Sequence, residues 1–221
     1  PFGYFERLLE SNTQVGKKIQ KQRQRLQNAT SPQEAKRCLA LLRQLIAQLS
    51  VPTDLAKEVE GLLNKGPYMV RSSASGEDNP NYSGAGLYQS VPSVPAEGVS
   101  QAVLAVYQSL YSDRAFMARQ EMGLSEDQAH MAVIIQKMGP ADFSFVVHTK
   151  DPTNGNGTNG GKVLIEVALG LGESVVGGSG AHLIRYDPKT RMLTPVALVS
   201  QSKKLVSLPE GGTQEVLVEM K

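Results

Sequence analysis

The stretch YMVRSSASGED, at residues 68–78, marks the point where the chain changes character. It begins as a short apolar strand and ends in small, hydroxyl-bearing and acidic residues. Before it, apolar residues recur at the three- and four-residue spacing of amphipathic helices. After it, short strand-like segments are separated by breaks rich in glycine and proline. We therefore expect a helical segment over 1–65 and a strand-rich portion over 66–221, forming an α+β fold with mixed or antiparallel sheets rather than a doubly wound sheet.

Amphipathic helices account for the first part of the chain. Residues 33–49 place leucines and an isoleucine on one helical face. Ser31 or Thr30 can cap the start of this helix, with Pro32 in its first turn. A second helix is predicted over 53–63, with Thr53 as its N-cap.

Basic and glutamine side chains dominate residues 14–27, QVGKKIQKQRQRLQ. One interpretation is a basic arm for an anionic partner. The other is the solvated face of a helix that packs through Val15, Ile19 and Leu26. The whole chain of 221 residues carries 23 Lys and Arg against 21 Asp and Glu, a net charge of +2. This balance does not suit a protein that coats nucleic acid, so we expect no nucleic-acid partner.

Other classes are excluded by composition. Cys38 is the only cysteine, which rules out a disulfide scaffold and a cysteine-ligated zinc site. The sequence contains no apolar run long enough to span a membrane, and we expect no membrane partner. No secretory leader is visible. The first residue is Pro1 rather than Met, and we expect a piece of a longer protein.

The second part is expected to alternate strands and turns after one helix. That helix covers 99–119. Two strands, 131–138 and 143–149, read as buried, and GPAD forms a tight connection between them. Further strands are predicted at 162–168, 181–186, 195–200 and 215–220.

Arg71 stands at the end of a strand, directly before two hydroxyl residues. A guanidinium in that position can donate two parallel hydrogen bonds to phosphate oxygens, and the hydroxyls of Ser72 and Ser73 can donate further hydrogen bonds. Alternatively, Arg71 pairs with Glu77 or Asp78 and has only a structural role. The residues alone leave both interpretations open.

Two glycine-bearing segments also suit a ligand. In YSGAGLYQS, residues 82–90, Gly84 and Gly86 allow a close backbone approach to phosphate, although the segment can equally be a simple turn. In IEVALGLGESVVGG, residues 165–178, the carboxylates can hold a ribose hydroxyl or magnesium, or can simply be solvated. The histidines lie in separate segments without metal-ligand spacing, and no metal ligand is assigned within this chain.

Taken together, VRSSASGEDNPNYSGAGLYQSVPSV resembles the signature of the nucleotide-binding part of the dikinases, which include phosphoenolpyruvate synthase, pyruvate phosphate dikinase and the α-glucan water dikinases. Three further segments match the same family in their order and spacing. They are SLYSDRA (109–115), VIIQKM (133–138) and the run from DPTNG to GLGESVV (151–176). The resemblance is close over about 66–206 and looser in the helical front. Three segments resemble the glucan water dikinases more than the phosphoenolpyruvate synthases: GAGLYQSVP, FSFVVHT and the opening PFGYFE.

This resemblance implies an ATP-grasp fold with ATP clamped between two subdomains. It also implies an enzyme, a phosphotransferase that moves the β-phosphate of ATP to a histidine and then to an α-glucan, releasing AMP and phosphate. Such transfer depends on positioning and charge cancellation. The alternatives are the same module of a phosphoenolpyruvate synthase, or a non-catalytic nucleotide-binding module.

The resemblance also assigns residues near the phosphates. Arg71 matches the family's phosphate-binding arginine and is the one residue expected to act in catalysis. Ser72 follows it as a further nucleotide contact. Gly86 matches the glycine of the phosphate loop, and Ser90 falls where relatives have Thr or Ser. Arg114 matches a recurring arginine, for which we expect a structural role that ties its helix to the sheet.

The remaining assignments concern adenine and ribose. Gln136, Lys137 and Met138 fall on the hinge strand whose backbone reads the base, and the apolar run before them is expected to form a dry wall. Glu166 and Glu173 lie near the nucleotide, in roles that the resemblance does not define.

Several family motifs are absent from this sequence. They are the upstream glycine-rich lysine motif, the downstream acidic residue and QTR segment that hold magnesium, and the Thr-Cys-His phosphohistidine motif. We therefore expect ATP and Mg²⁺ as cofactors, with the main magnesium ligands outside this chain. Glucan binding and the phosphohistidine are expected in other domains of the same protein. The expected location is the cytoplasm, or the plastid stroma if the protein comes from a plant or alga.

Overall fold

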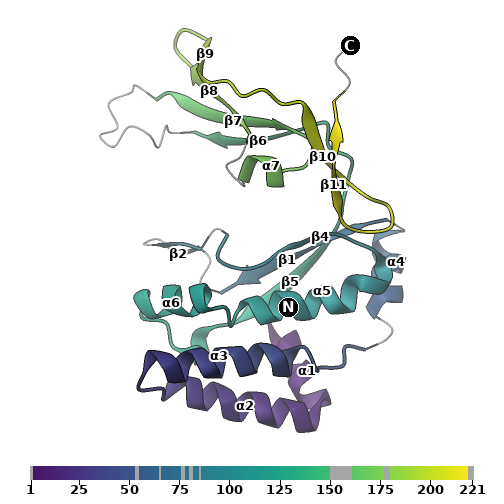
Figure 1. Cartoon of the computed structure of the whole chain (residues 1–221), viewed down its shortest axis with the longest axis vertical. Coiled ribbons are helices and arrows are strands. Elements are labelled where there is room, and N and C mark those ends of the chain that lie inside the picture. The colour runs from purple at the N-terminus through teal and green to yellow at the C-terminus, as the bar shows by residue number, and fades with distance from the viewer. Residues whose placement is uncertain are drawn as a thin grey trace. The chain divides into compact units, whose positions relative to one another are not determined.

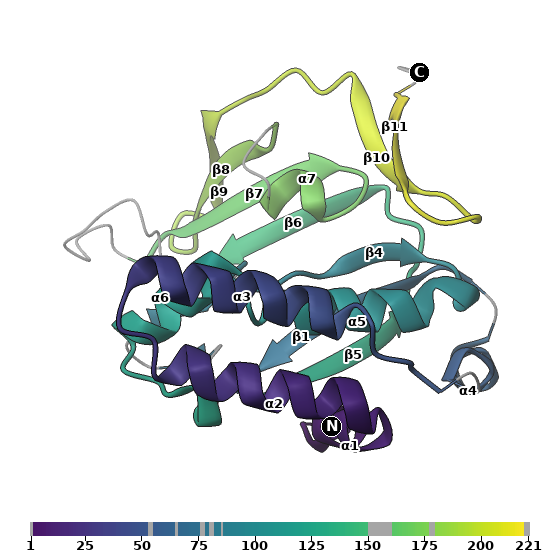
Figure 2. The ribbon, with the colours of Figure 1, turned by 60° about the horizontal axis from the view of Figure 1, so that its bottom comes forward.

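The computed structural model describes residues 2–52, 55–64, 66–75, 78–79, 82–84, 86–149, 161–176 and 180–218. The chain divides into two compact units: the first comprises residues 1–138 with 209–211, and the second 139–208 with 212–221. Helices and antiparallel sheets are both present (Figures 1 and 2), which confirms the α+β class. No helix in the described ranges combines the length and apolar character needed to cross a membrane.

The first unit opens with helices α1 (Gly3–Ser11), α2 (Thr13–Gln27), α3 (Pro32–Ile46) and α4 (Leu55–Leu63). Ser31 is the N-cap of α3, because its Oγ accepts a hydrogen bond from the Glu34 amide at 3.2 Å. Pro32 occupies the first turn, where its missing N–H is not needed. The predicted cap of α4, Thr53, lies outside the described residues.

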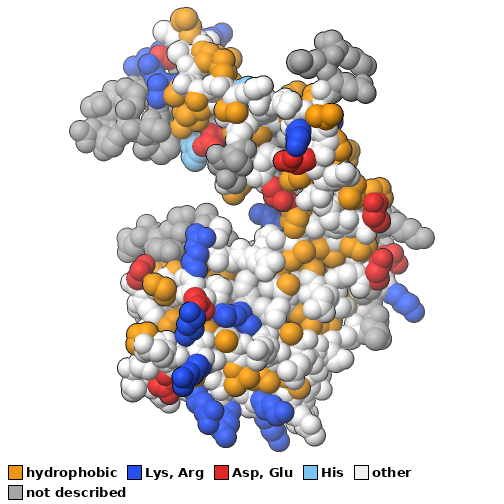
Figure 3. Space-filling view, viewed as in Figure 1, with side chains coloured by type: hydrophobic (Ala, Val, Ile, Leu, Met, Phe, Trp, Pro, Cys, Tyr) orange, Lys and Arg blue, Asp and Glu red, His pale blue; other side chains and the backbone are white. Residues whose placement is uncertain are grey.

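Helix α2 turns its basic side chains to solvent. Ile19 and Leu26 are buried, whereas Lys17, Lys21 and Arg25 are exposed. Figure 3 shows Lys and Arg side chains gathered along the lower edge of the first unit, where α2 runs. This arrangement fits the solvated helix face that was one of the two interpretations of the basic segment.

A three-stranded antiparallel sheet forms the other layer of the first unit. Its strands are β1 (Tyr68–Ala74), β4 (Val91–Val94) and β5 (Met131–Lys137), in the order β4–β1–β5. The short strands β2 (Asp78–Asn79) and β3 (Tyr82–Ser83) pair separately. Two 3₁₀ turns (Ala96–Gly98 and Glu126–Gln128) flank the helices that follow, α5 (Val99–Ser109) and α6 (Asp113–Glu121).

The single helix predicted over 99–119 is therefore wrong. Ser112 is extended, with ψ of 151°, and its Oγ accepts a hydrogen bond from the Ala115 amide at 3.1 Å. A serine in this position ends one helix and caps the next.

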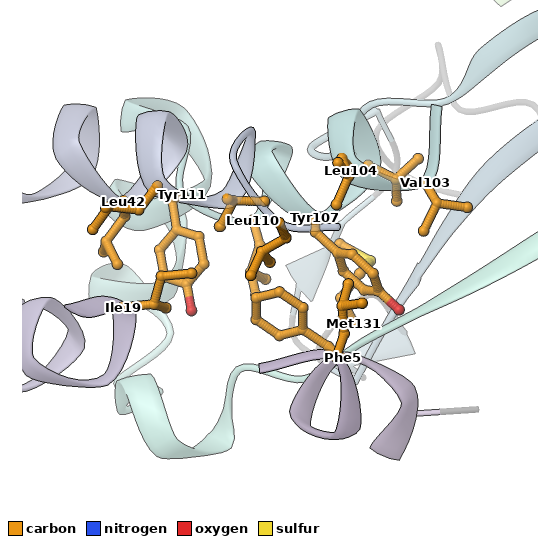
Figure 4. Packing of buried hydrophobic residues seen from close by; sticks show 14 of the residues in the cluster. Phe5, Ile19, Leu42, Val103, Leu104, Tyr107, Leu110, Tyr111 and Met131 are labelled. Carbon is orange, nitrogen blue, oxygen red and sulfur yellow. The ribbon is translucent and has the colours of Figure 1, made fainter. Parts of the chain in front are cut away.

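The main core lies between the sheet and the helices. Figure 4 shows Phe5 of α1, Tyr107 of α5 and Met131 of β5 packed together. The Phe5 and Tyr107 rings stack with centroids 4.5 Å apart. The helical residues 1–65 thus share one core with the first strands, and the expected segment boundary is a change of secondary structure inside the first unit.

The arginine that ties α6 to its surroundings is Arg119, not Arg114. Arg114 is exposed, and its side chain makes no hydrogen bond or ion pair with the described residues. Arg119 is only 1% exposed, donates to the Leu110 carbonyl at 2.6 Å and pairs with buried Glu126 at 3.0 Å. The structural role expected for Arg114 therefore falls to Arg119, because only Arg119 lies on the inward face of α6.

The second unit is a four-stranded antiparallel sheet with a separate hairpin. The sheet runs β6 (Phe143–His148), β7 (Val163–Leu169), β8 (His182–Asp187) and β9 (Met192–Ala197), and the hairpin consists of β10 (Lys203–Ser207) and β11 (Thr213–Leu217). The short helix α7 (Glu173–Val176) packs against β6 and β7. β9 and β11 begin two or three residues before the predicted strands, and β10 was not predicted.

The two strands that were predicted to be buried, β5 and β6, are not buried on both faces. β6 alternates strictly, and Phe143, Phe145 and Val147 are exposed. β5 likewise leaves Ile134 at 49% exposure. Both are edge strands, so an unbroken apolar run in the sequence does not require cover on both sides.

Candidate functional site

One face of the sheet β4–β1–β5 carries the strongest group of predicted contacts. Val70 of β1 is fully buried toward α5, so the next residue, Arg71, points to the opposite face, where it is exposed. Cross-strand partners share a face, and β5 pairs Ile134 with Arg71 and Gln136 with Met69. Arg71 and Gln136 are thus diagonal neighbours, about 7–8 Å apart at Cα. Both are exposed.

The charge of Arg71 is not neutralised by any described side chain. It has no ion pair or hydrogen bond within the part of the chain that the structure describes. By contrast, Arg43 pairs with Asp113 and Arg119 with Glu126, each at 3.0 Å. The alternative partner Glu77 lies outside the described residues, as does the side chain of Asp78. An exposed guanidinium without a described partner can donate hydrogen bonds to the oxygens of a phosphate.

The two serines after Arg71 lie on opposite faces of β1. Ser72 pairs with Val133, which packs against the core, whereas Ser73 pairs with Ala132 on the side of Arg71. A ligand on the face of Arg71 can therefore reach the Ser73 hydroxyl but not the Ser72 hydroxyl. The sequence alone could have revealed this from the alternation of a strand, once Val70 was assigned to the core.

A tight turn precedes β4. The Leu87 amide donates to the Gly84 carbonyl at 3.0 Å, and Gly86, the third residue of this turn, has φ of +70°. That left-handed conformation favours glycine. Ser90 is exposed and directly precedes Val91, the partner of Val70. Ser90 therefore lies next to the start of β4, the strand that borders β1 on the side away from β5.

The end of β5 supplies the remaining predicted contacts of the first unit. Gln136 and Lys137 are exposed, and Met138 is half-buried. The Met138 amide donates to the Pro67 carbonyl at 2.9 Å, so this donor is already engaged. Among the described strands β5 pairs only with β1, which leaves its other edge outside the ladder.

The apolar surface predicted beside the base includes fewer residues of β5 than expected. Met131, Val133 and Ile135 point into the core, and only Ala132 and Ile134 lie on the face of Arg71. Strand alternation is the reason, because every second residue of the apolar run belongs to the packing under the sheet.

In the second unit, Glu166 has a histidine beside it. Its Oε1 lies 3.5 Å from Nε2 of His148, with the Glu166 side chain 32% exposed. Glu166 lies two residues from each of the buried Leu164 and Ala168 along β7, so it shares their face. His148 thus has a local partner for its ring, in keeping with a structural histidine.

Glu173 begins α7 and lines a hollow of about 370 Å³ together with Gln201 and Lys203. The glycine turn before it has a packing reason. Gly170 has φ of +80°, and a Cβ there would collide with the backbone of Leu205 in β10. Leu171 also donates to the Leu205 carbonyl at 2.9 Å. This glycine joins β7 to β10, which needs no ligand to explain it.

The described residues on the face of Arg71 include several groups that can bind a polar ligand. An exposed cation, an amide, hydroxyls and an apolar side chain come together there, and the described residues of that face include no carboxylate. The described chain also contains no group of three His, Cys, Asp or Glu residues that could hold a metal ion.

A protein-family description matches nearly the whole chain. The description is "Pyruvate phosphate dikinase, AMP/ATP-binding domain", and it covers residues 4–221. Relatives include a rifampicin phosphotransferase of Streptomyces sviceus, 32% identical over 85% of this chain and 22% of the relative. An α-glucan water dikinase of Solanum tuberosum is 26% identical over 94% of this chain and 13% of the relative. A probable phosphoenolpyruvate synthase of Methanocaldococcus jannaschii is 33% identical over 62% and 12%. The chain thus spans less than a quarter of each of these relatives.

Proposed function

The chain belongs to the family of pyruvate phosphate dikinase AMP/ATP-binding domains, and from this premise we propose that it is the ATP-binding part of a dikinase acting on α-glucan. In this proposal the protein moves the β-phosphate of ATP to a histidine elsewhere in the polypeptide, and then to a glucosyl hydroxyl. AMP and phosphate are released, and water receives the γ-phosphate.

The observation that carries the proposal is the position of Arg71. It is a strand arginine without a described counter-charge, on the same face as Gln136. Its strand pairs with β4, which Ser90 directly precedes. One face of a single sheet thus presents the Arg71 guanidinium, which can bind phosphate, and the Gln136 side-chain amide, which can contact the base. Arg71 and Gln136 come from two separate motifs, VRSSASGEDNPNYSGAGLYQSVPSV and VIIQKM, and lie on one face of the sheet.

The chain's own residues have defined parts in this proposal. Arg71 binds and orients phosphate oxygens, and the turn at Gly86 brings backbone close to them. Ile134 gives the base an apolar contact. The edge of β5 that pairs with no described strand offers backbone groups that can hydrogen-bond to the edge of the base. Glu166 and Glu173 remain candidate contacts to the ribose side. Magnesium, when bound, supplies charge neutralisation of the triphosphate, and we propose that its main ligands lie outside this chain.

Glucan is proposed as the acceptor because of the extent of the similarity. The α-glucan water dikinases of Solanum tuberosum and Citrus reticulata each align over 94% of this chain, including the helical front. GAGLYQSVP and FSFVVHT, which resemble the glucan branch, support the same acceptor.

Rifampicin is the second candidate acceptor, since the Streptomyces sviceus phosphotransferase has the higher identity, 32% against 26%. The sequence interpretation did not consider it. Pyruvate is the third candidate acceptor, if the protein is a phosphoenolpyruvate synthase.

The test is made on the full-length protein with ATP labelled at the β-phosphate. Solubilised amylopectin, rifampicin and pyruvate are offered in parallel reactions. We expect label first on the protein and then on amylopectin, with AMP formed. Transfer to rifampicin or pyruvate instead would overturn the glucan assignment, and label on neither protein nor acceptor would overturn the dikinase mechanism.

Arg71→Ala is the informative variant, and Arg37→Ala is its matched control, because Arg37 is an exposed arginine on α3. Loss of protein labelling in the first variant only, with both proteins folded, is the expected result. Equal labelling in both variants would contradict the assignment of Arg71.

A further inference from the structure

The loop from Gly86 to Ser90 has one buried anchor. Gly86, Gln89 and Ser90 are exposed, whereas Leu87 is only 7% exposed. Leu87 forms a small hydrophobic cluster with Ala115 and Ala118, separate from the main core.

The seat for Leu87 is made by small residues on α6. Ala115 and Ala118 are 0% and 4% exposed and lie three residues apart, on one helical face. Alanines leave room for a leucine side chain that a larger residue would fill. The partly buried Tyr88 and Met122 pack against the same cluster.

α6 is itself firmly held. Arg43 of α3 donates to the Tyr111 carbonyl at 2.6 Å and to Asp113 Oδ1 at 3.0 Å. Arg119, paired with buried Glu126, ties the helix from its inner side. The segment SLYSDRA, residues 109–115, thereby supplies the cap of α6, the Arg43 contacts and the first alanine of the seat.

The opposite side of the loop is hollow. A space of about 550 Å³ is lined by Arg43, Gly86, Leu87, Tyr88, Gln89, Gln108, Ser109 and Ser112. Two contacts that hold the loop are the hydrogen bond from the Leu87 amide to the Gly84 carbonyl and the packing of the Leu87 side chain on Ala115 and Ala118. Tyr88 also packs, against this cluster and against the main core.

We propose that Leu87 is a positioning residue for the nucleotide. Its side chain, seated on Ala115 and Ala118, fixes where Gly86 and Ser90 stand relative to Arg71. This inference rests on the proposed function, because it assumes that the loop meets ATP phosphates. A loop that is ordered only part of the time binds with an affinity reduced by that fraction.

The experiment compares Leu87→Ala with Leu26→Ala in the full-length protein. Leu26 is a 2% exposed leucine of α2 that belongs to the main core rather than to the Leu87 cluster. We expect Leu87→Ala to raise the KM for ATP in autophosphorylation roughly tenfold, which equals about 1.4 kcal/mol. Leu26→Ala should lower the melting temperature without changing that KM, and Leu87→Met should restore it.

Hydrogen–deuterium exchange gives a readout that does not depend on activity. The peptide covering 84–90 should exchange faster in Leu87→Ala, or in the milder Leu87→Val if the first variant fails to fold. A peptide from α2 should be unchanged.

The outcomes separate the two proposals. Wild-type KM and wild-type exchange in a folded Leu87 variant would overturn the positioning role. Faster loop exchange with an unchanged KM would also overturn it, because the loop would then not set ATP affinity. If the wild-type protein transfers no phosphate, the proposed function fails. With it fails the inferred role toward ATP, even if exchange still shows Leu87 anchoring the loop.

Discussion

At the scale of single residues, strand alternation separates two hydroxyls that the sequence places side by side. Ser73 shares the face of Arg71, whereas Ser72 faces the core side with Val133. We predict that Ser73→Ala raises the KM for ATP several-fold, since a hydrogen bond contributes about 0.5–1.5 kcal/mol. Ser72→Ala should leave that KM within about twofold. Steady-state autophosphorylation of the full-length protein measures both, and a larger effect of Ser72→Ala would show that the ligand approaches differently.

The sequence was informative about residue types but not about their directions. A strand arginine followed by hydroxyls indicated phosphate chemistry from local chemistry alone. Which serine accompanies Arg71 depends on which face α5 covers, and that is a contact between distant segments. In the same way, Arg119 rather than Arg114 became the buried tie because only the packing of α6 decides which of its faces points inward.

At the scale of elements, the junction of β7 and β10 depends on one glycine. Gly170 has φ of +80°, and a Cβ there would fall on the Leu205 carbonyl oxygen and within 2.7 Å of the Leu205 amide nitrogen. We predict that Gly170→Ala lowers the free energy of unfolding of the second unit by about 1–3 kcal/mol. Gly172→Ala is the matched control, because a Cβ at Gly172 meets no atom within 4 Å.

Urea unfolding of the 221-residue chain measures this difference. The control should change the free energy of unfolding by no more than about 0.5 kcal/mol. Equal effects of the two variants would mean that β10 can move away from Gly170 at little cost.

Elements were predictable where the signal was local. The N-cap Ser31 and the amphipathic face of α3 fixed that helix within a few residues. The break between α5 and α6 was missed, because apolar spacing continues across it and only the Ser112 cap shows the interruption. β5 and β6 were read as buried because an apolar run does not reveal that a strand lies at the edge of its sheet.

At the scale of the whole molecule, the core of the first unit links stability to pH. Burial raises the pKa of Tyr111 from the ordinary 10 to about 12 and also raises the pKa of Tyr107. The folded state therefore favours the neutral phenols. Their contribution to stability is fully present below pH 10 and is lost as the pH rises from 10 toward 12.

We predict that the free energy of unfolding of the first unit falls above pH 10 and that Tyr111→Phe reduces this slope. Chemical unfolding at several alkaline pH values measures it. Tyr186→Phe, in the second unit, is the control and should leave the slope of the first unit unchanged. If Tyr111→Phe left the dependence of the free energy of unfolding on pH unchanged, groups other than Tyr111 would cause the loss of stability at alkaline pH.

The last prediction concerns what the 221 residues can do by themselves. We expect the isolated chain to bind ATP weakly and to phosphorylate no glucan. Phosphoryl transfer of this kind requires cations that cancel the triphosphate charge and a group that receives the phosphate. The described face of Arg71 offers a guanidinium, hydroxyls and backbone, and the sequence contains neither the family's lysine motif nor its phosphohistidine motif.

The measurement uses the purified chain with β-labelled ATP, magnesium and solubilised amylopectin, beside the full-length protein as the positive control. Label on amylopectin in the full-length reaction only is the expected result, because the transferring histidine is then present. Label on the isolated chain above a boiled control would show that its own residues suffice to accept the phosphate. In that case the exposed His130 would have to be tested first as an acceptor, before the half-buried His148 and His182.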